Sequence, residues 1–321
     1  MKFFQIGALL AFALFVGSVF SQAYPVKPVR IIVPIGPGSG PDARARQLAS
    51  KFPEFLGQPL IVENKAGGGG VIAGEAVARA PADGYTLLLG NAATHVFTPM
   101  LQLKPPYRVD EDFIPITSLS KGYWVIAANV SVPVRSFSDL LQLAKSQPGV
   151  LRYASTGEGS YPHLLMESIK LTSALEFTHI PYKSAAAEVP DLLGGPIEFA
   201  VDSHVVFAPL INSGKLKGLA VAGPRRIASL PGVPTLVEAG GPNLDINVWQ
   251  GVFAPAGTPT AITRRLHAEI IKILNLPDIR NPIIEGGYEM GGESAEEFAA
   301  FVRADRAMWA KVIKEVKVQP R

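Results

Sequence analysis

The 321-residue sequence contains no cysteine. The chain can therefore form no disulfide, no thiolate metal site, no cysteine nucleophile and no lipid-modified cysteine. It also has little net charge: 30 basic side chains exceed 27 acidic ones by three, without any basic stripe, so no nucleic-acid partner is expected. Charged residues are 18% of the sequence and hydrophobic residues 48%, which indicates a folded chain with substantial cores.

Residues 1–23 have the pattern of an export signal. Lys2 precedes an almost wholly apolar run from Phe3 to Phe20, and Ser21-Gln22-Ala23 supplies small residues at a cleavage site. We expect cleavage after Ala23 and a soluble protein in the periplasm. The alternative is an uncleaved anchor, because the uncharged run just reaches the about 18 to 20 residues that span a bilayer.

Short apolar segments alternate with helical patterns along the rest of the chain, which predicts an α/β fold with largely parallel sheets. A chain of this length exceeds what one hydrophobic core usually holds, and no long polar linker divides it, so we expect two lobes joined by two short crossings. One lobe is expected to hold residues 24–122 and 249–321, and the other residues 123–248.

The expected elements follow from local patterns of apolar and turn-forming residues. Thr258-Pro259 and the capping box Ser294–Glu297 predict the starts of two helices near the C-terminus. Trp309 lies on the apolar stripe of the second, where a core role is expected. The expected strands are residues 29–34, 60–63, 85–89, 124–128, 151–154, 177–180, 197–201 and 216–220, and the earlier helices are residues 44–55, 73–79, 137–145 and 162–171.

The sequence offers little support for catalysis or metal binding. No two of its five histidines have the i, i+4 spacing of a helical zinc site. Ser39 and Ser160 lie in glycine-rich loops, but a proline replaces one glycine of a nucleophile elbow in each. The glycine loops lack both the lysine of a phosphate loop and the third glycine of a dinucleotide fingerprint. We therefore expect no catalytic residue, no metal and no cofactor.

Three loops rich in glycine, hydroxyl and amide groups each lie between a predicted strand and a helix: residues 36–42, 91–95 and 155–160. Backbone N–H groups at helix starts suit a carboxylate or a phosphate, and α/β sheets bind ligands at the carboxyl ends of strands. The same residue types dominate ordinary turns. The residues alone thus leave two interpretations, anion-binding loops or simple turns. The four glycines Gly67–Gly70 are interpreted as a structural turn.

Several segments carry a resemblance to a known family along essentially the whole exported chain. They are Tyr24–Pro34, Pro37-Gly38 with Asp42 and Ala45-Arg46, Val62–Gly70, Asp83–Leu88, Tyr182-Lys183, Asp191–Gly195, Leu230–Thr235 and Gly251–Pro259. Together and in this order they resemble the Bug family, the periplasmic solute receptors of tripartite tricarboxylate transporters.

The resemblance implies a two-lobed periplasmic binding protein fold, the type II-like Venus flytrap with two interlobe crossings. It also implies a small carboxylate ligand, aliphatic or aromatic, held in the cleft by backbone amides and ordered water. The implied ligand-binding residues are Ile35, Gly38, Ser39, Gly40, Asn91, Ala92, Thr94 and His95 of the first lobe, and Ser155, Thr156, Gly159, Ser160, His163, Tyr182 and Asp202 of the second.

Three departures from the family pattern prevent the transfer of ligand identity. Ile35 stands where an aromatic is usual, Ser39 replaces a usual glycine, and Tyr161-Pro162 is bulkier than the usual residues. We expect Ser39 and Thr156 to donate hydrogen bonds to the carboxylate and Asp42 to have a structural role.

The function that the resemblance implies is that of a monomeric, non-enzymatic receptor that delivers its ligand to integral-membrane transporter subunits. Two alternatives use the same sequence features. One is a ligand sensor for a signalling receptor. The other is an exported serine hydrolase that would pair Ser39 or Ser160 with His95 or His163.

Overall fold

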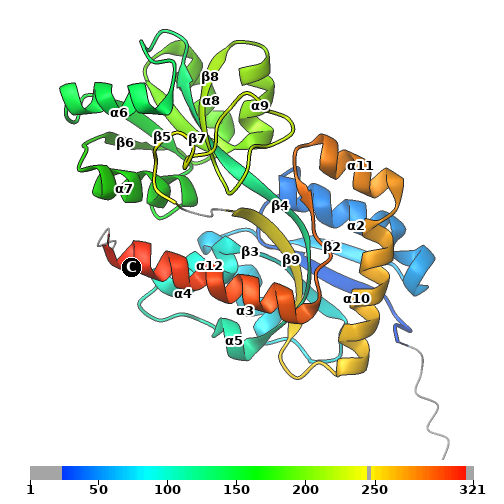
Figure 1. The fold of residues 1–321 in the computed structure, drawn as a ribbon. Coiled ribbons are helices and arrows are strands. Elements are labelled where there is room, and N and C mark those ends of the chain that lie inside the picture. Colours follow the sequence, from blue (N-terminus) through cyan, green and yellow to red (C-terminus); the bar gives the residue numbers. More distant parts are fainter. Residues whose placement is uncertain (1–23, 244–246, 316–321) are drawn as a thin grey trace, which may run out of the picture.

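The structure is a computed structural model that describes residues 24–243 and 247–315. The predicted export signal, residues 1–23, lies outside the described residues. The described strands form one connected array that divides into two sheets, and these give the molecule two lobes with helices packed around each sheet (Figure 1). In the described ranges no helix is both long and apolar enough to cross a membrane.

The first lobe is built on a sheet with the strand order β2-β1-β3-β9-β4, and a short β10 pairs with β4. Helices α2, α10 and α11 pack their apolar faces on this sheet around buried Leu48, Phe52 and Ile270. The bounds are β1 Val29–Val33, α2 Gly40–Leu56, β2 Leu60–Asn64, η1 Gly68–Gly70, α3 Val71–Ala78, β3 Thr86–Asn91, η2 Ala93–Phe97, α4 Thr98–Leu101, α5 Val109–Asp112, β4 Phe113–Asn129, β9 Asn247–Pro255, α10 Thr260–Leu274, α11 Pro277–Glu285, β10 Glu289–Met290 and α12 Ala295–Glu315.

The second lobe uses the other end of β4. There β4 pairs with β7 on one side and β8 on the other, and β7 continues to β5 and β6. The bounds are α6 Phe137–Ser146, β5 Arg152–Ser155, α7 Tyr161–Ser173, β6 Thr178–Pro181, α8 Ala185–Gly194, β7 Phe199–Ser203, α9 His204–Asn212 and β8 Leu216–Ala222.

The sheets are mixed, so the expectation of largely parallel sheets is wrong. The pairs β1–β2, β1–β3, β5–β6 and β5–β7 are parallel. Every described pair that involves β4 or β9 is antiparallel. The physical reason is the route of the chain: β4 leaves the first lobe, and β9 returns to it in the opposite direction. The local sequence pattern predicts only residues 124–128 of β4 as a strand and predicts no strand over β9.

Most expected helices are present. The two helix starts that were predicted from capping residues can be compared with the structure. The capping box before α12 is confirmed, because Glu297 N donates to Ser294 Oγ at 3.2 Å and Ser294 N donates to Glu297 Oε2 at 3.0 Å. At α10 the expected cap is wrong. The Thr258 hydroxyl donates to the Pro255 carbonyl at 2.7 Å, and Pro259 occupies the capping position.

Among the helices that have no counterpart in the expected elements, the three longest are α8, α9 and α11. Each contains an internal proline, Pro190, Pro209 and Pro282 respectively. Proline removes a backbone donor and usually marks a helix end in sequence, so the local pattern concealed these helices. In the fold, tertiary packing of buried Leu192, Phe207 and Ile283 stabilises them.

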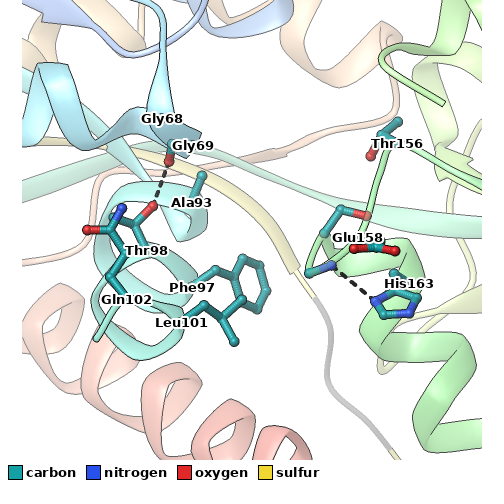
Figure 2. A pocket seen from close by; sticks show the side chains of 12 residues that line it. Gly68, Gly69, Ala93, Phe97, Thr98, Leu101, Gln102, Thr156, Glu158 and His163 are labelled. Carbon is teal, nitrogen blue, oxygen red and sulfur yellow. Dashed lines mark hydrogen bonds between the residues drawn. The ribbon is translucent and has the colours of Figure 1, made fainter. Parts of the chain in front are cut away.

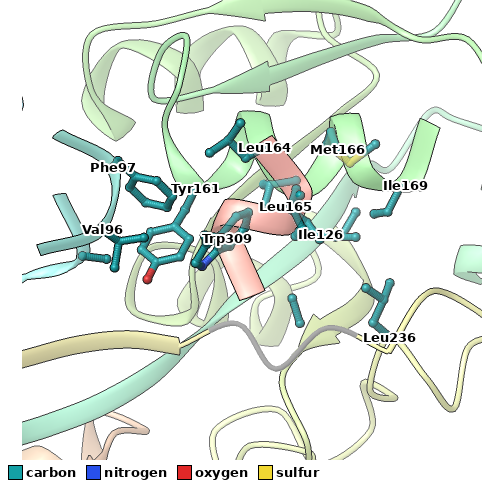
Figure 3. Packing of buried hydrophobic residues seen from close by; sticks show 14 of the residues in the cluster. Val96, Phe97, Ile126, Tyr161, Leu164, Leu165, Met166, Ile169, Leu236 and Trp309 are labelled. Atoms are coloured by element: carbon teal, nitrogen blue, oxygen red, sulfur yellow. The ribbon is translucent and has the colours of Figure 1, made fainter. Parts of the chain in front are cut away.

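The C-terminal helix α12 connects the packing of the two lobes. Trp309 is fully buried, which confirms its expected core role. The centroid of its ring lies 5.2 Å from that of Phe97 and 5.0 Å from that of Tyr161 (Figure 3). Asp305 of the same helix accepts hydrogen bonds from Trp249 Nε1 at 2.8 Å and from the Tyr161 hydroxyl at 3.2 Å. Because Tyr161 begins α7 of the second lobe, α12 ties the start of that helix to the first lobe.

Candidate functional site

The described residues form two neighbouring cavities at the junction of the lobes. Their volumes are about 890 and 340 Å³, and both are lined by Ala93, Phe97, Thr156 and Ser160. Figure 2 shows the larger one, with Phe97, Thr98 and Gln102 on one side and Thr156, Glu158 and His163 on the other. We refer to the two cavities together as the cleft.

The smaller cavity is surrounded by the starts of three helices. Gly40 and Pro41 begin α2, Tyr161 and Pro162 begin α7, and Ser203 precedes α9. The unpaired N–H groups and the dipole of a helix start favour a negative charge nearby. At α9 this capacity is partly used, because Ser203 N already donates to the carboxylate of Asp202. The starts of α2 and α7 are therefore the groups best suited to stabilise an anion in this cavity.

The loop before α2 is held in shape by Asp42. One carboxylate oxygen, Oδ2, accepts from Gly38 N at 2.9 Å and from Arg46 Nε at 3.0 Å, and Oδ1 accepts from Asn64 Nδ2 at 2.9 Å. The bond to Arg46, followed by that to Gly38, lowers the pKa of Asp42 to about 2. Asp42 is buried and does not line the cleft, so its structural role is confirmed.

Ser39 is the helix cap of α2. Its Oγ accepts from Asp42 N at 3.3 Å, and the residue does not line either cavity. Its neighbours Ile35 and Gly40 do line the smaller cavity. Ser39 thus holds the helix start while other residues of the loop form part of the cavity wall.

The loop of the second lobe is also tied internally. Ser155 Oγ accepts from Gly157 N at 3.1 Å, and the Ser160 hydroxyl donates to the Gly157 carbonyl at 2.6 Å. Gly159 N donates to His163 Nδ1 at 3.1 Å, so the other ring nitrogen of His163 carries the proton in the neutral form. The Ser160 hydroxyl and His163 Nδ1 are thus both engaged with the backbone of this loop.

Of the fifteen expected ligand-binding residues, the structure brings eight to the wall of the cleft. The other seven lie in the supporting loops or in the core, and the fifteen assignments stay predictions. The eight are Ile35, Gly40, Asn91, Ala92, Thr156, Gly159, Ser160 and His163, and the seven are Gly38, Ser39, Thr94, His95, Ser155, Tyr182 and Asp202.

His95 and its neighbour Thr94 are core residues in this structure. Both are fully buried, Thr94 Oγ1 lies 2.8 Å from His95 Nδ1, and the histidine ring stacks on Phe253 at 3.8 Å. Burial is the main cause that lowers the pKa of His95 to about 3. A neutral ring enclosed in this way has no face toward the cleft, so a direct ligand contact by His95 is not what the structure supports.

Tyr182 and Asp202 are engaged with other acidic side chains of the second lobe. The Tyr182 hydroxyl donates to Asp191 Oδ2 at 2.6 Å. Asp202 on β7 interacts with the buried Glu188 of α8, and burial together with this like charge raises the pKa of Glu188. Burial and the neighbouring Asp202 thus favour the protonated form of Glu188.

Several lining residues escaped the sequence analysis. Two come from Gly67–Gly70, since Gly68 and Gly69 line the larger cavity although a purely structural turn was expected. The aromatic and amide residues of β4 and β9 had no local signal, because only long-range pairing brings them to the cleft. Pro41 and Ala93 belong to two of the predicted loops, and the other lining residues of the smaller cavity that were not predicted are Phe97, Trp124, Tyr161, Pro162, Ser203, Val248, Trp249, Gln250 and Tyr288.

Comparisons with known proteins agree with this geometry. Residues 44–318 match the family described as the tripartite tricarboxylate transporter family receptor. Protein BugT of Bordetella pertussis is 33% identical over 312 residues, which cover 97% of this chain and 95% of BugT.

Solved structures give the same result. Rpa4515 of R. palustris, solved with adipate, is 32% identical with a TM-score of 0.83 and covers 93% of this chain and 100% of its own. MatC (Rpa3494) of Rhodopseudomonas palustris, with bound malate, is 29% identical with a TM-score of 0.78. The match covers 90% of this chain and 100% of MatC. These matches confirm the two-lobed binding-protein fold. They also confirm the expected resemblance to the Bug family, whose members are receptors and not enzymes.

The role of Asp42 predicts a pH-dependent loss of stability. Because its pKa is lowered in the folded state, Asp42 stabilises the fold above its unfolded pKa of about 3.9, and this contribution disappears as the pH falls toward about 2. We expect Asp42→Ala to lower the free energy of unfolding at pH 7 by roughly 1 to 3 kcal/mol. Urea unfolding should show the difference from the parent narrowing between pH 5 and pH 2.

The matched control for this variant is Glu54→Ala on the same helix. The Glu54 carboxylate is 62% exposed and makes only a 3.9 Å ion pair with Lys51, so its removal should leave the unfolding midpoint nearly unchanged. A loss for Asp42→Ala that equals the control, or that is independent of pH, would contradict the structural role.

Proposed function

The chain belongs to the tripartite tricarboxylate transporter receptor family, and we propose that it captures a small carboxylate in the cleft and delivers it to the membrane subunits of such a transporter. The titles of two solved relatives name adipate and malate as their ligands, which supports a carboxylate here. A sensor for a signalling receptor would use the same cleft and stays an alternative prediction.

The observation that carries the proposal is the convergence of α2 and α7 on an uncharged cavity. One helix start belongs to each lobe, and the described lining of the smaller cavity contains no charged side chain. A carboxylate between them gains hydrogen bonds from backbone amides of both lobes. The proposed contacts are the backbone at Ile35, Gly40, Asn91 and Ala92 and the groups of Thr156, Gly159, Ser160 and His163.

We propose that one lobe comprises residues 24–122 and 249–321 and the other residues 123–248. The support is the pairing of β4, which joins β9 up to Tyr123 and joins β7 and β8 from Trp124 onward. The chain would act as a monomer whose lobes approach each other around the ligand.

The receptor is proposed to work in the periplasm after export. The apolar run of residues 3–20 supports this placement, and so does the family to which the chain belongs. The exported protein should begin at or near Tyr24. An intact-mass measurement of the protein recovered from the periplasm checks this, and a mass that includes Met1 would contradict it.

Thr156 is the side chain most suited to test the anion site, because it lines both cavities. Thr156→Val keeps the shape and removes the hydroxyl. A hydrogen bond to a charged group contributes about 1.5 to 3 kcal/mol, so we expect ten- to hundred-fold weaker binding. Calorimetry with the best carboxylate from a thermal-shift screen of mono-, di- and tricarboxylates measures it.

The control is Thr263→Val on the exposed helix α10, where the hydroxyl donates only to the Thr260 carbonyl at 3.1 Å. It should bind the same carboxylate as the parent does. If Thr156→Val also binds like the parent, the loop of the second lobe is not part of the anion site.

Closure of the lobes should be visible in solution. A ligand that contacts helix starts from both lobes stabilises the conformation in which the lobes lie together. Small-angle scattering should therefore give a smaller radius of gyration with saturating carboxylate than with the same concentration of sodium chloride. An unchanged radius at proven saturation would argue against hinge closure.

A further inference from the structure

The cleft is lined by very few charged side chains. The residues that line the smaller cavity include no Lys, Arg, Asp, Glu or His, and the larger cavity adds only Glu158 and His163 within the described chain. One carboxylate is accommodated by the starts of α2 and α7. A second carboxylate would find no lysine or arginine in either described lining, and in the larger cavity it would lie near the acidic Glu158.

The walls of the smaller cavity are largely aromatic and aliphatic. Trp124, Tyr161, Trp249 and Tyr288 line it together with Phe97, and the Trp124 and Tyr161 rings lie 5.8 Å apart. Aromatic side chains of this kind offer faces and edges on which a flat ring packs favourably. A volume of about 340 Å³ is at the small end of ligand cavities, so the body of the ligand is small as well.

Two buried polar groups at this cavity lack a protein partner. Gln250 is only 3% exposed, and its Oε1 accepts no hydrogen bond from the described residues. The indole Nε1 of Trp124 is likewise buried without a hydrogen-bond acceptor among them. An unpaired buried acceptor is unfavourable unless a ligand or water satisfies it. A carboxylate cannot donate to Gln250 Oε1, whereas a ligand hydroxyl can.

Resting on the proposed carboxylate-receptor function, we propose that the ligand is an aromatic monocarboxylate that carries a hydroxyl substituent, rather than a di- or tricarboxylate. Its carboxylate lies at the starts of α2 and α7. Its ring packs among the aromatic walls, and its hydroxyl donates to Gln250 Oε1 and accepts from Trp124 Nε1. Dicarboxylates of the size of adipate and malate bind more weakly because the described linings offer no lysine or arginine to their second charge and place Glu158 near it.

Calorimetry on the exported protein tests the ligand class with benzoate, the three hydroxybenzoates, adipate and malate. We expect at least one hydroxybenzoate to bind ten-fold or more tightly than adipate or malate, and several-fold more tightly than benzoate. Dicarboxylate binding equal to or tighter than that of every ring acid overturns this inference and leaves the receptor function standing. If none of the six acids binds, and a wider carboxylate screen is also negative, the receptor function itself fails.

The role of Gln250 is tested separately with Gln250→Leu. This variant should bind benzoate like the parent but lose most of the preference for the hydroxybenzoate. Gln102→Leu, in the larger cavity, is the matched control and should keep that preference. A preserved preference in Gln250→Leu overturns the assignment of Gln250. If Gln250→Leu does not fold, Trp124→Phe provides the second measurement, because it removes the indole donor and keeps an aromatic wall.

Discussion

The geometry of the site depends on one continuous strand. β4 pairs in the first sheet up to Tyr123 and in the second sheet from Trp124, so a single backbone fixes the relation between the two sheets. The strands β1, β3, β5 and β7 all end toward the junction, and the turns after them lead into α2, η2, α7 and α9. Four strand-to-helix turns therefore meet at the cleft, as expected for ligand sites of α/β sheets.

The charged groups near the cleft are mostly used inside the protein. Asp42 is paired with Arg46 and accepts from the backbone N–H of Gly38, and the buried Asp202 lies beside Glu188, whose pKa is raised. The field at the cleft consequently comes from backbone dipoles more than from side-chain charges. Such a site binds an anion without an arginine, and its selectivity comes from the shape and polarity of the remaining walls.

Local signals made much of this fold predictable. A β-branched strand followed by glycine and serine and then a helical pattern is readable in sequence, which is why the loops with Gly40 and Thr156 were identified. Residues that long-range pairing brings to the cleft could not be identified from the sequence. Nothing near Gln250 or Tyr288 in the sequence indicates which strand or helix lies beside them in the fold. The burial of His95 was likewise not predictable, because the π-helical turn Ala93–Phe97, which directs its ring into the core, has no local signal in the sequence.

The proposed anion site is divided between the two lobes, and this division has a consequence for affinity. Because α2 belongs to the first lobe and α7 to the second, neither lobe alone supplies both helix starts, and the binding free energy depends on how easily the lobes come together. The bonds of Asp305 to Trp249 and Tyr161 already draw the start of α7 toward the first lobe. These contacts reduce the part of the binding free energy that closure consumes, which favours tight binding even of a ligand that offers a single charge.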